Sequence, residues 1–130
     1  LDRVIYSSFH YPVNYGFIPQ TLGQDSDPLD ILVICGESIN PLCLVEATVI
    51  GNMQMIDNGE IDDKIIAVAS KDPSVNFYTD VAELPKHFIA VLRNYFEQYK
   101  IVEIDDFQDK SAAYKVIEAA ISFYKTNFNK

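Results

Sequence analysis

Hydrophobic residues follow two different periods along this chain. In the first half they form short runs, such as residues 31–35 between Pro28 and Gly36, which is the pattern of a buried strand. After Pro73 they recur every three or four residues, which is the period of an amphipathic helix. The pattern therefore predicts strands first and helices afterwards.

The first half reads as short strands joined by turns. The aromatic segment 11–19 contains two prolines and a glycine and favours a short strand between loops. Asn58-Gly59 is a strong hairpin signal, because both residue types tolerate a positive φ. Several short strands of this kind favour a small barrel. Further strands are expected at residues 31–35, 43–50, 54–56 and 64–68.

The second half predicts two helices, each with one apolar stripe. Pro85 can occupy the first turn of the first helix, and Ser111 is the expected N-cap of the second, which has Lys125 near its end. We interpret both stripes as packing surfaces rather than as cofactor sites. The stripes comprise Phe88, Val91, Leu92, Tyr95, Phe96 and Tyr99, and then Ala113, Val116, Ile117, Ala120, Ile121 and Tyr124.

Length and composition limit the possible classes of protein. A chain of 130 residues with 48% hydrophobic content suits one domain, here residues 1–130. The net charge of -9 argues against binding nucleic acid or an anionic membrane by bulk charge. No apolar run approaches the roughly 20 residues of a membrane helix. Without a signal-peptide pattern, we expect a cytoplasmic protein with Cys35 and Cys43 reduced in the core.

The negative charge is concentrated in one stretch of the chain. Residues 25–64 hold nine acidic residues and one basic residue, Lys64, so this stretch carries -8 of the charge of -9. Carboxylates this close together repel one another, and a hard divalent cation bound through oxygens is the usual compensation. The sequence thus indicates a metal site.

The first acidic signature is Asp25-Ser26-Asp27-Pro28-Leu29-Asp30. Its three carboxylates could converge near the mouth of a barrel, because Pro28 prevents a regular helix there. A solvated turn explains the same residues, since Asp, Ser and Pro are turn formers. A calcium-binding EF-hand loop does not, because its sixth and twelfth positions, which require Gly and Glu, hold Asp30 and Gly36.

The second signature runs from Asp57 to Lys64. Asp62 and Lys64 are two residues apart in a strand and so share a face, and Asp57 stands across the turn from them. A surface ion pair is one explanation of this pattern. In a cleft with divalent metals, Lys64 would instead meet an oxyanion that the metals also bind. Glu37, Glu46, Glu60 and Asp63 are interpreted as surface charge.

Together the two signatures resemble a known family, the family I soluble inorganic pyrophosphatases. Residues 25–31 are similar to that family's D-x-D-P-x-D-x signature, and residues 57–68 to its D-x-x-x-x-D-x-K-I-I-A-V segment. Two further stretches agree: residues 9–18 resemble the Y-P-x-N-Y-G-[YF]-I strand, and residues 95–100 resemble the F-F-E-x-Y-K helix.

The resemblance implies an α+β fold, with a small closed or partly open OB-like β-barrel of about five strands flanked by two C-terminal helices. It also implies Mg²⁺-dependent hydrolysis of inorganic pyrophosphate to two phosphates, with several Mg²⁺ ions in each active site. Asp25, Asp30 and Asp62 would hold the ions that bridge the attacking water, and Asp57 would help to bind metals that arrive with substrate. Asp27 would accept a proton from that water. Pyrophosphate would be bound by Arg3, Tyr15, Lys64, Tyr99 and Lys100, with Tyr11 nearby.

Other expectations concern the rest of the protein. His10 is interpreted as structural and His87 as a residue on a helix surface. The family's N-terminal strand region, which supplies Glu and Lys ligands, has no counterpart here, so we expect the chain to be a fragment. The family also implies a homo-oligomer, a dimer or a hexamer. The competing hypothesis is a non-catalytic barrel that binds divalent metals or polyanions.

Overall fold

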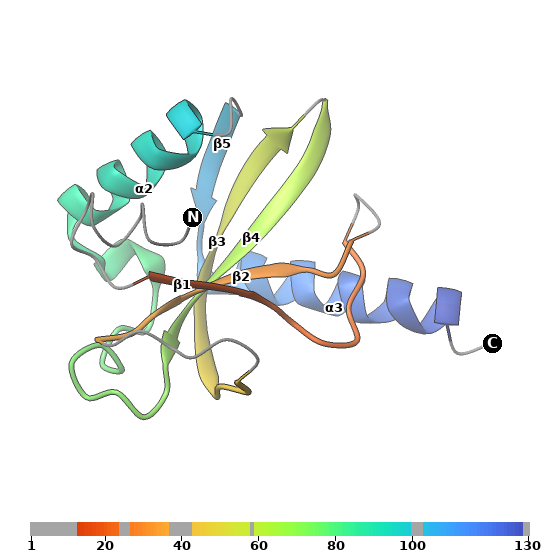
Figure 1. Ribbon diagram of the computed structural model, residues 1–130, viewed down its shortest axis with the longest axis horizontal. Coiled ribbons are helices and arrows are strands. Elements are labelled where there is room, and N and C mark those ends of the chain that lie inside the picture. The colour runs from red at the N-terminus through yellow and green to blue at the C-terminus, as the bar shows by residue number, and fades with distance from the viewer. Residues whose placement is uncertain (1–12, 24–26, 37–42, 58, 100–102, 129–130) are drawn as a thin grey trace.

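The structure is a computed structural model that describes residues 13–23, 27–36, 43–57, 59–99 and 103–128 (Figure 1). The sequence predicts strands followed by helices, but in the structure a strand also lies between the two long helices. In chain order they are β1 (Val13–Phe17), β2 (Asp30–Ile34), β3 (Ala47–Asp57), β4 (Glu60–Ala69), the 3-10 helix η1 (Val81–Glu83), α2 (Lys86–Tyr99), β5 (Glu103–Gln108) and α3 (Lys110–Phe128).

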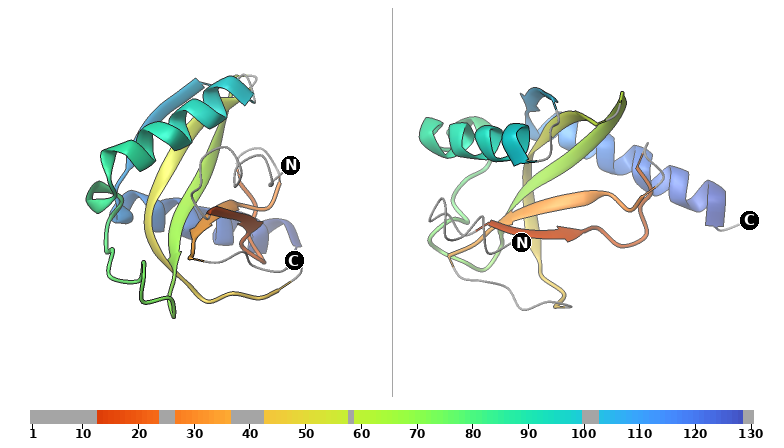
Figure 2. Two further views of the ribbon diagram at one scale, coloured as in Figure 1. Left: turned by 60° about the vertical axis from the view of Figure 1, so that its left-hand side comes forward. Right: turned by 45° about the horizontal axis from the view of Figure 1, so that its top comes forward.

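The five strands form one twisted sheet in the order β1-β2-β4-β3-β5. Strands β2 and β4 are parallel, and the other three pairs are antiparallel. The sheet is open among the described residues, and the long β3–β4 hairpin curves away from the shorter β1–β2 pair (Figures 1 and 2). The predicted α+β class, a partly open OB-like barrel with two helices, is confirmed.

The predicted hairpin is present and is longer than expected. Asp57 pairs with Glu60 across the turn, where Gly59 has a φ of 81°. The two segments predicted as separate strands at 43–50 and 54–56 belong to the single strand β3, which begins only at Ala47. The register of β3 against β4 shifts between Val49 and Gly51, and the pairing continues on both sides of this irregularity.

Strand β5 was not predicted. Its sequence, Glu-Ile-Asp-Asp-Phe-Gln, is rich in acidic residues that are uncommon in strands. It pairs with β3 at the edge of the sheet, where a strand needs only one neighbour. Tertiary pairing therefore overrides a weak local preference.

The two helices cover opposite faces of the sheet. Successive residues of β4 point to opposite sides, so that Ile66 packs with Phe88, Leu92 and Phe96 of α2, and Ile65 packs toward α3. The buried face of α3 is made of small residues such as Ala113 and Ala120. Both predicted stripes thus serve as packing surfaces, except at Ile121, which is 37% exposed.

The start of α3 differs from the expectation. Asp109 is the N-cap, because its Oδ1 accepts a hydrogen bond of 2.9 Å from the amide of Ala112. The predicted cap, Ser111, lies inside the helix. Asp80 adds a second tie here: it caps η1 and also accepts a hydrogen bond from the amide of Lys110.

The structure also tests the cysteines and the question of a membrane span. Cys35 and Cys43 are both free, as expected, but Cys43 is exposed and so is not a core residue. His87 is exposed on α2, as predicted. Within the part of the chain that the structure describes, no helix is long and apolar enough to cross a membrane.

Candidate active site

Lys64 is the most deeply buried charged side chain of the described residues, with 1% of its surface exposed. It lies on the face of β4 that also carries Asp62, as the two-residue spacing predicts. Strand β2 brings a third group, because Asp30 is the register partner of Lys64 in the parallel β2–β4 pair. Two carboxylates from distant segments therefore meet one ammonium group.

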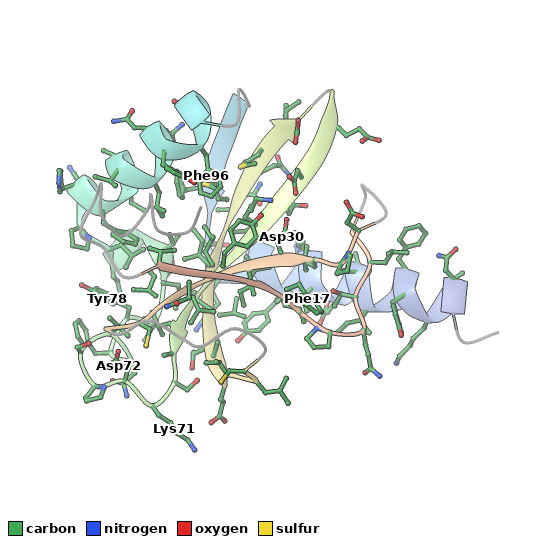
Figure 3. All side chains as sticks on the ribbon, viewed as in Figure 1. Phe17, Asp30, Lys71, Asp72, Tyr78 and Phe96 are labelled. Carbon is green, nitrogen blue, oxygen red and sulfur yellow. The ribbon has the colours of Figure 1, made fainter. Side chains whose placement is uncertain are left out.

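The three groups are in direct contact. Lys64 Nζ donates hydrogen bonds to Asp30 Oδ2 at 2.6 Å and to Asp62 Oδ2 at 3.1 Å. Asp30 and Asp62 are 28% and 13% exposed, so that the carboxylates form the wall between the buried ammonium and solvent. Figure 3 shows Asp30 at the point where β2 begins to run beside β4.

Tyr15 of β1 completes this cluster. Its hydroxyl donates to Asp30 Oδ2 at 3.1 Å, and Lys64 Nζ lies 5.4 Å from the centre of its ring, within the range of a cation–π contact. Partial burial of the phenol is the largest cause that raises the pKa of Tyr15 to about 12, and the negative charge of Asp30 acts in the same direction. Tyr15 is therefore a neutral hydrogen-bond donor at neutral pH.

The contacts of Lys64 determine its charge state. Burial disfavours the ammonium, but the hydrogen bonds with Asp30 and Tyr15 outweigh that effect and hold the pKa of Lys64 above its usual value. Lys64 is therefore a fixed cation over the physiological range of pH. A fixed cation beside two carboxylates suits a ligand that combines metal ions with anionic oxygens.

Hydrogen bonds hold the described parts of the loop between β1 and β2, which we call the acidic loop because it contains the first acidic signature. The buried hydroxyl of Thr21 donates to the carbonyl of Ile18 at 2.6 Å and accepts from the amide of Leu29 at 3.0 Å. The amide of Leu22 donates to the carbonyl of Ala120 in α3 at 3.0 Å. These contacts fix both ends of the segment that contains Asp27.

The other predicted site residues lie elsewhere in the described part of the chain or lie outside the described residues. Asp27 is exposed in the loop before β2, and Asp57 ends β3 on the side of the hairpin that carries Asp62 by strand alternation. Tyr99 is the last residue of α2, and its side chain is outside the described part. Arg3, Tyr11, His10, Asp25 and Lys100 also lie outside the described residues.

A cavity of about 630 Å³ lies between the acidic loop, the start of β4 and α3. Its walls include Asp30, Asp62, Asp63 and Lys115, together with apolar residues of α3. The cavity therefore lies on the α3 side of β4, next to the segment that contains Asp62 and Asp63.

Sequence reasoning missed one polar group of the site. Asp63 was interpreted as surface charge, but it is only 9% exposed, so that interpretation was wrong. Because Asp62 and Lys64 face one side of β4, Asp63 faces the other side, which α3 covers. The alternation of the strand was the signal that could have predicted this burial.

Carboxylate oxygens of this kind suit Mg²⁺. Asp30 and Asp62 already converge on one cation, the ammonium of Lys64, which shows that the two can share a positive charge. Groups of three or more possible metal ligands are absent among the described residues, and the third predicted ligand, Asp25, is outside them. The residues present therefore fit part of the expected ligand set.

The protein is an α+β protein with an open OB-like sheet, in which two partly exposed carboxylates contact one buried lysine. Residues 1–125 match the family model described as inorganic pyrophosphatase. The chain belongs to the inorganic pyrophosphatase family.

Curated relatives and solved structures agree with this assignment. Soluble inorganic pyrophosphatase 4 of Arabidopsis thaliana is 49% identical over 129 residues, which cover 95% of this chain and 60% of that protein. Soluble inorganic pyrophosphatase 2 of Chlamydomonas reinhardtii is 44% identical, with 98% and 69% covered. The inorganic pyrophosphatase structure from Helicobacter pylori has a TM-score of 0.84 at 36% identity, covering 88% of this chain and 72% of that one. The chain thus spans about 60% of the length of the Arabidopsis relative.

Proposed function

We propose that the protein hydrolyses inorganic pyrophosphate to two phosphates in a Mg²⁺-dependent reaction. The observation that carries this proposal is the contact of one buried ammonium, Lys64, with the carboxylates of Asp30 and Asp62. Membership of the pyrophosphatase family supports the choice of substrate. Pyrophosphate is small and highly charged, so fixed charges rather than an apolar pocket should recognise it.

Different side chains bind the substrate and accept the proton. Lys64 and Tyr15 bind phosphate oxygens, together with Arg3, Tyr99 and Lys100. Asp27 takes a proton from water as the water oxygen forms a bond to one phosphorus atom. The bond from that phosphorus to the bridging oxygen breaks, and the departing phosphate keeps the electron pair.

Mg²⁺ is the proposed cofactor, with several ions in each active site. Asp25, Asp30, Asp57 and Asp62 would hold these ions through their carboxylates. Bound Mg²⁺ would lower the pKa of the attacking water and neutralise charge on the phosphates. The residues present supply hard oxygen donors, which suit Mg²⁺ better than softer metals.

We also propose a domain boundary, a compartment and an assembly state. Residues 1–130 form one pyrophosphatase domain, the protein acts in the cytoplasm, and it assembles as a homo-oligomer, a dimer or a hexamer. The curated relatives are named soluble inorganic pyrophosphatases, which supports a soluble compartment such as the cytoplasm. The net charge of -9 supports the absence of nucleic acid and anionic membranes among its partners.

Phosphate release from pyrophosphate tests the function in the complete encoded protein. We expect turnover only with added Mg²⁺, and we expect Asp27→Asn to lower it by about 10²–10⁴-fold because a general base is removed. Glu46→Gln is the matched control, since the side chain of Glu46 is exposed and, among the described residues, forms only a long ion pair of 3.9 Å with Lys71. Turnover that ignores either Mg²⁺ or Asp27→Asn contradicts the proposal.

Binding without turnover would favour the non-catalytic barrel instead. Calorimetry with Mg²⁺ and a non-hydrolysable pyrophosphate analogue measures binding separately from hydrolysis. Tight binding of both, with no phosphate released by the wild-type protein, would establish that alternative.

A further inference from the structure

A second polar cluster lies behind β4, on the side opposite to Lys64. Asp63 Oδ1 accepts hydrogen bonds from Asn52 Nδ2 at 2.9 Å and, more weakly, from Gln54 Nε2 at 3.4 Å. Asn52 is fully buried and Asp63 is 9% exposed, so both groups are largely removed from water. No ion pair of Asp63 is recorded among the described residues, and neutral amides therefore solvate its carboxylate.

The cluster connects three strands. Asn52 Nδ2 also donates to Gln108 Oε1 of β5 at 2.9 Å, so that side-chain hydrogen bonds run from β4 through β3 to β5. Both amide hydrogens of Asn52 are thereby used. Its Oδ1 is buried and has no hydrogen-bond partner among the described residues, which by itself lowers the stability of the folded state.

The position of the cluster along β4 indicates the role of its hydrogen bonds. Strand β2 pairs with β4 only from Lys64 to Val68, so Asp62 and Asp63 lie beyond its support. At these two residues β4 is paired only with β3 among the described strands. The amide–carboxylate contacts fix β4 at Asp63, where it has no backbone pairing with β2. Asp63 lies between Asp62 and Lys64.

We propose that Asn52 and Asp63 are positioning residues that fix the start of β4, so that Asp62 and Lys64 face Mg²⁺ and phosphate in the correct geometry. This inference rests on the proposed function for its consequence, but the positioning itself is a property of the strand. Outer contacts that orient metal ligands typically change metal affinity or activity by about 10–100-fold. The arrangement is polar because a directional contact fixes strand position better than apolar packing does.

The test uses Asn52→Leu, which removes both hydrogen bonds and keeps a side chain of similar size. Mg²⁺ binding without pyrophosphate is measured by calorimetry, and amide exchange at residues 62–64 is measured in the same samples. We expect Mg²⁺ affinity to fall by roughly tenfold and exchange at these amides to accelerate by a similar factor. Asp63→Asn should stay within about threefold of the wild type, because the new side-chain oxygen can still accept from Asn52.

Thr48→Val is the matched control. It breaks the 2.8 Å side-chain contact between Thr48 and Ser70 at the other end of the same β3–β4 pair. Unchanged Mg²⁺ binding and exchange in Asn52→Leu would overturn the proposal, as would an equal loss in Thr48→Val. A loss in Asp63→Asn as large as in Asn52→Leu would also overturn it, since charge rather than position would then be responsible.

A double exchange, Asn52→Asp with Asp63→Asn, keeps the inference testable if Asn52→Leu does not fold. The exchange restores an amide–carboxylate pair with its members reversed, so near-wild-type exchange at residues 62–64 supports positioning and fast exchange overturns it. A wild-type protein that binds Mg²⁺ but does not hydrolyse pyrophosphate defeats the proposed function alone. If the wild type binds no Mg²⁺, the amide-exchange comparison decides the positioning by itself.

Discussion

Lys64 Nζ lies 2.6 Å from Asp30 Oδ2, although the two residues are 34 positions apart in the sequence. The parallel pairing of β2 with β4 produces this contact, because it makes the two residues register partners. Each acidic signature thus contributes one half of the same cluster. The fold, rather than either motif alone, converts concentrated charge into a site.

Replacing Lys64 by Met should destabilise the protein by roughly 3 kcal/mol, because removal of one partner leaves two carboxylates facing each other without their cation. Added Mg²⁺ should restore more stability to this variant than to the wild type, since the metal can replace the missing positive charge. Urea unfolding with and without MgCl₂ measures both effects. Lys71→Met is the control, because its ion pair with Glu46 is exposed and should contribute less than about 1 kcal/mol. Equal losses in the two variants would contradict the importance of the buried contact.

Tyr15→Phe should have a smaller effect on stability, about 0.5–1.5 kcal/mol, because Asp30 keeps its hydrogen bond to Lys64 when the tyrosine hydroxyl is lost. Turnover should fall more than stability does, since the hydroxyl is also a proposed phosphate ligand. Thermal unfolding and phosphate release are compared in the same preparations. Tyr114→Phe on α3 is the matched control, with 47% exposure against 43% for Tyr15. A loss of turnover in both variants would remove the case for a specific role of Tyr15.

Local patterns in the sequence were sufficient for much of the fold. The apolar run 31–35 is close to β2, Asn58-Gly59 marked the β3–β4 turn, and the stripe from Phe88 to Phe96 is the buried face of α2. Strand β5 was missed because its acidic sequence carries no strand signal and forms a strand only by pairing with β3. Asp109, rather than Ser111, caps α3, and both are good cap residues between which composition alone does not choose.

For the site too, local sequence patterns predicted some residues, and contacts between distant segments determined the others. Two-residue spacing correctly placed Asp62 and Lys64 on one face of a strand. The burial of Asp63 and its contact with Asn52 depend on α3 and on the register of β3, which are distant in sequence. Distant pairing therefore accounts for the groups that the motifs did not reveal.

Gly51→Ala should destabilise the protein by about 1–3 kcal/mol, because an added Cβ would lie 2.6 Å from Val81 Cβ and 2.8 Å from the carbonyl oxygen of Gln108. Relief of these clashes requires movement of both η1 and β5. Gly16→Ala in β1 is the control, since its added Cβ would meet only Ile31, at an ordinary contact distance of 3.9 Å. Denaturant midpoints compare the two variants, and an equal shift in both would show that close packing at Gly51 is not limiting.

Asp72 should make the free energy of unfolding depend on pH in the acid range. The amide of Gly36 and then the hydroxyl and amide of Ser74 donate to its carboxylate, and these hydrogen bonds lower the pKa of Asp72 from 3.8 to about 2. A lowered pKa in the folded state means that the stabilising contribution is complete above pH 4 and disappears as the pH falls from about 4 to 2. Asp72→Asn should therefore lower the unfolding temperature at pH 7 and flatten its decline between pH 4 and pH 2. Thermal unfolding across this range measures the slope, with Glu46→Gln as the control that should keep the wild-type slope. Parallel curves for Asp72→Asn and the wild type would show that the carboxylate does not tie the end of β2 to the segment after β4.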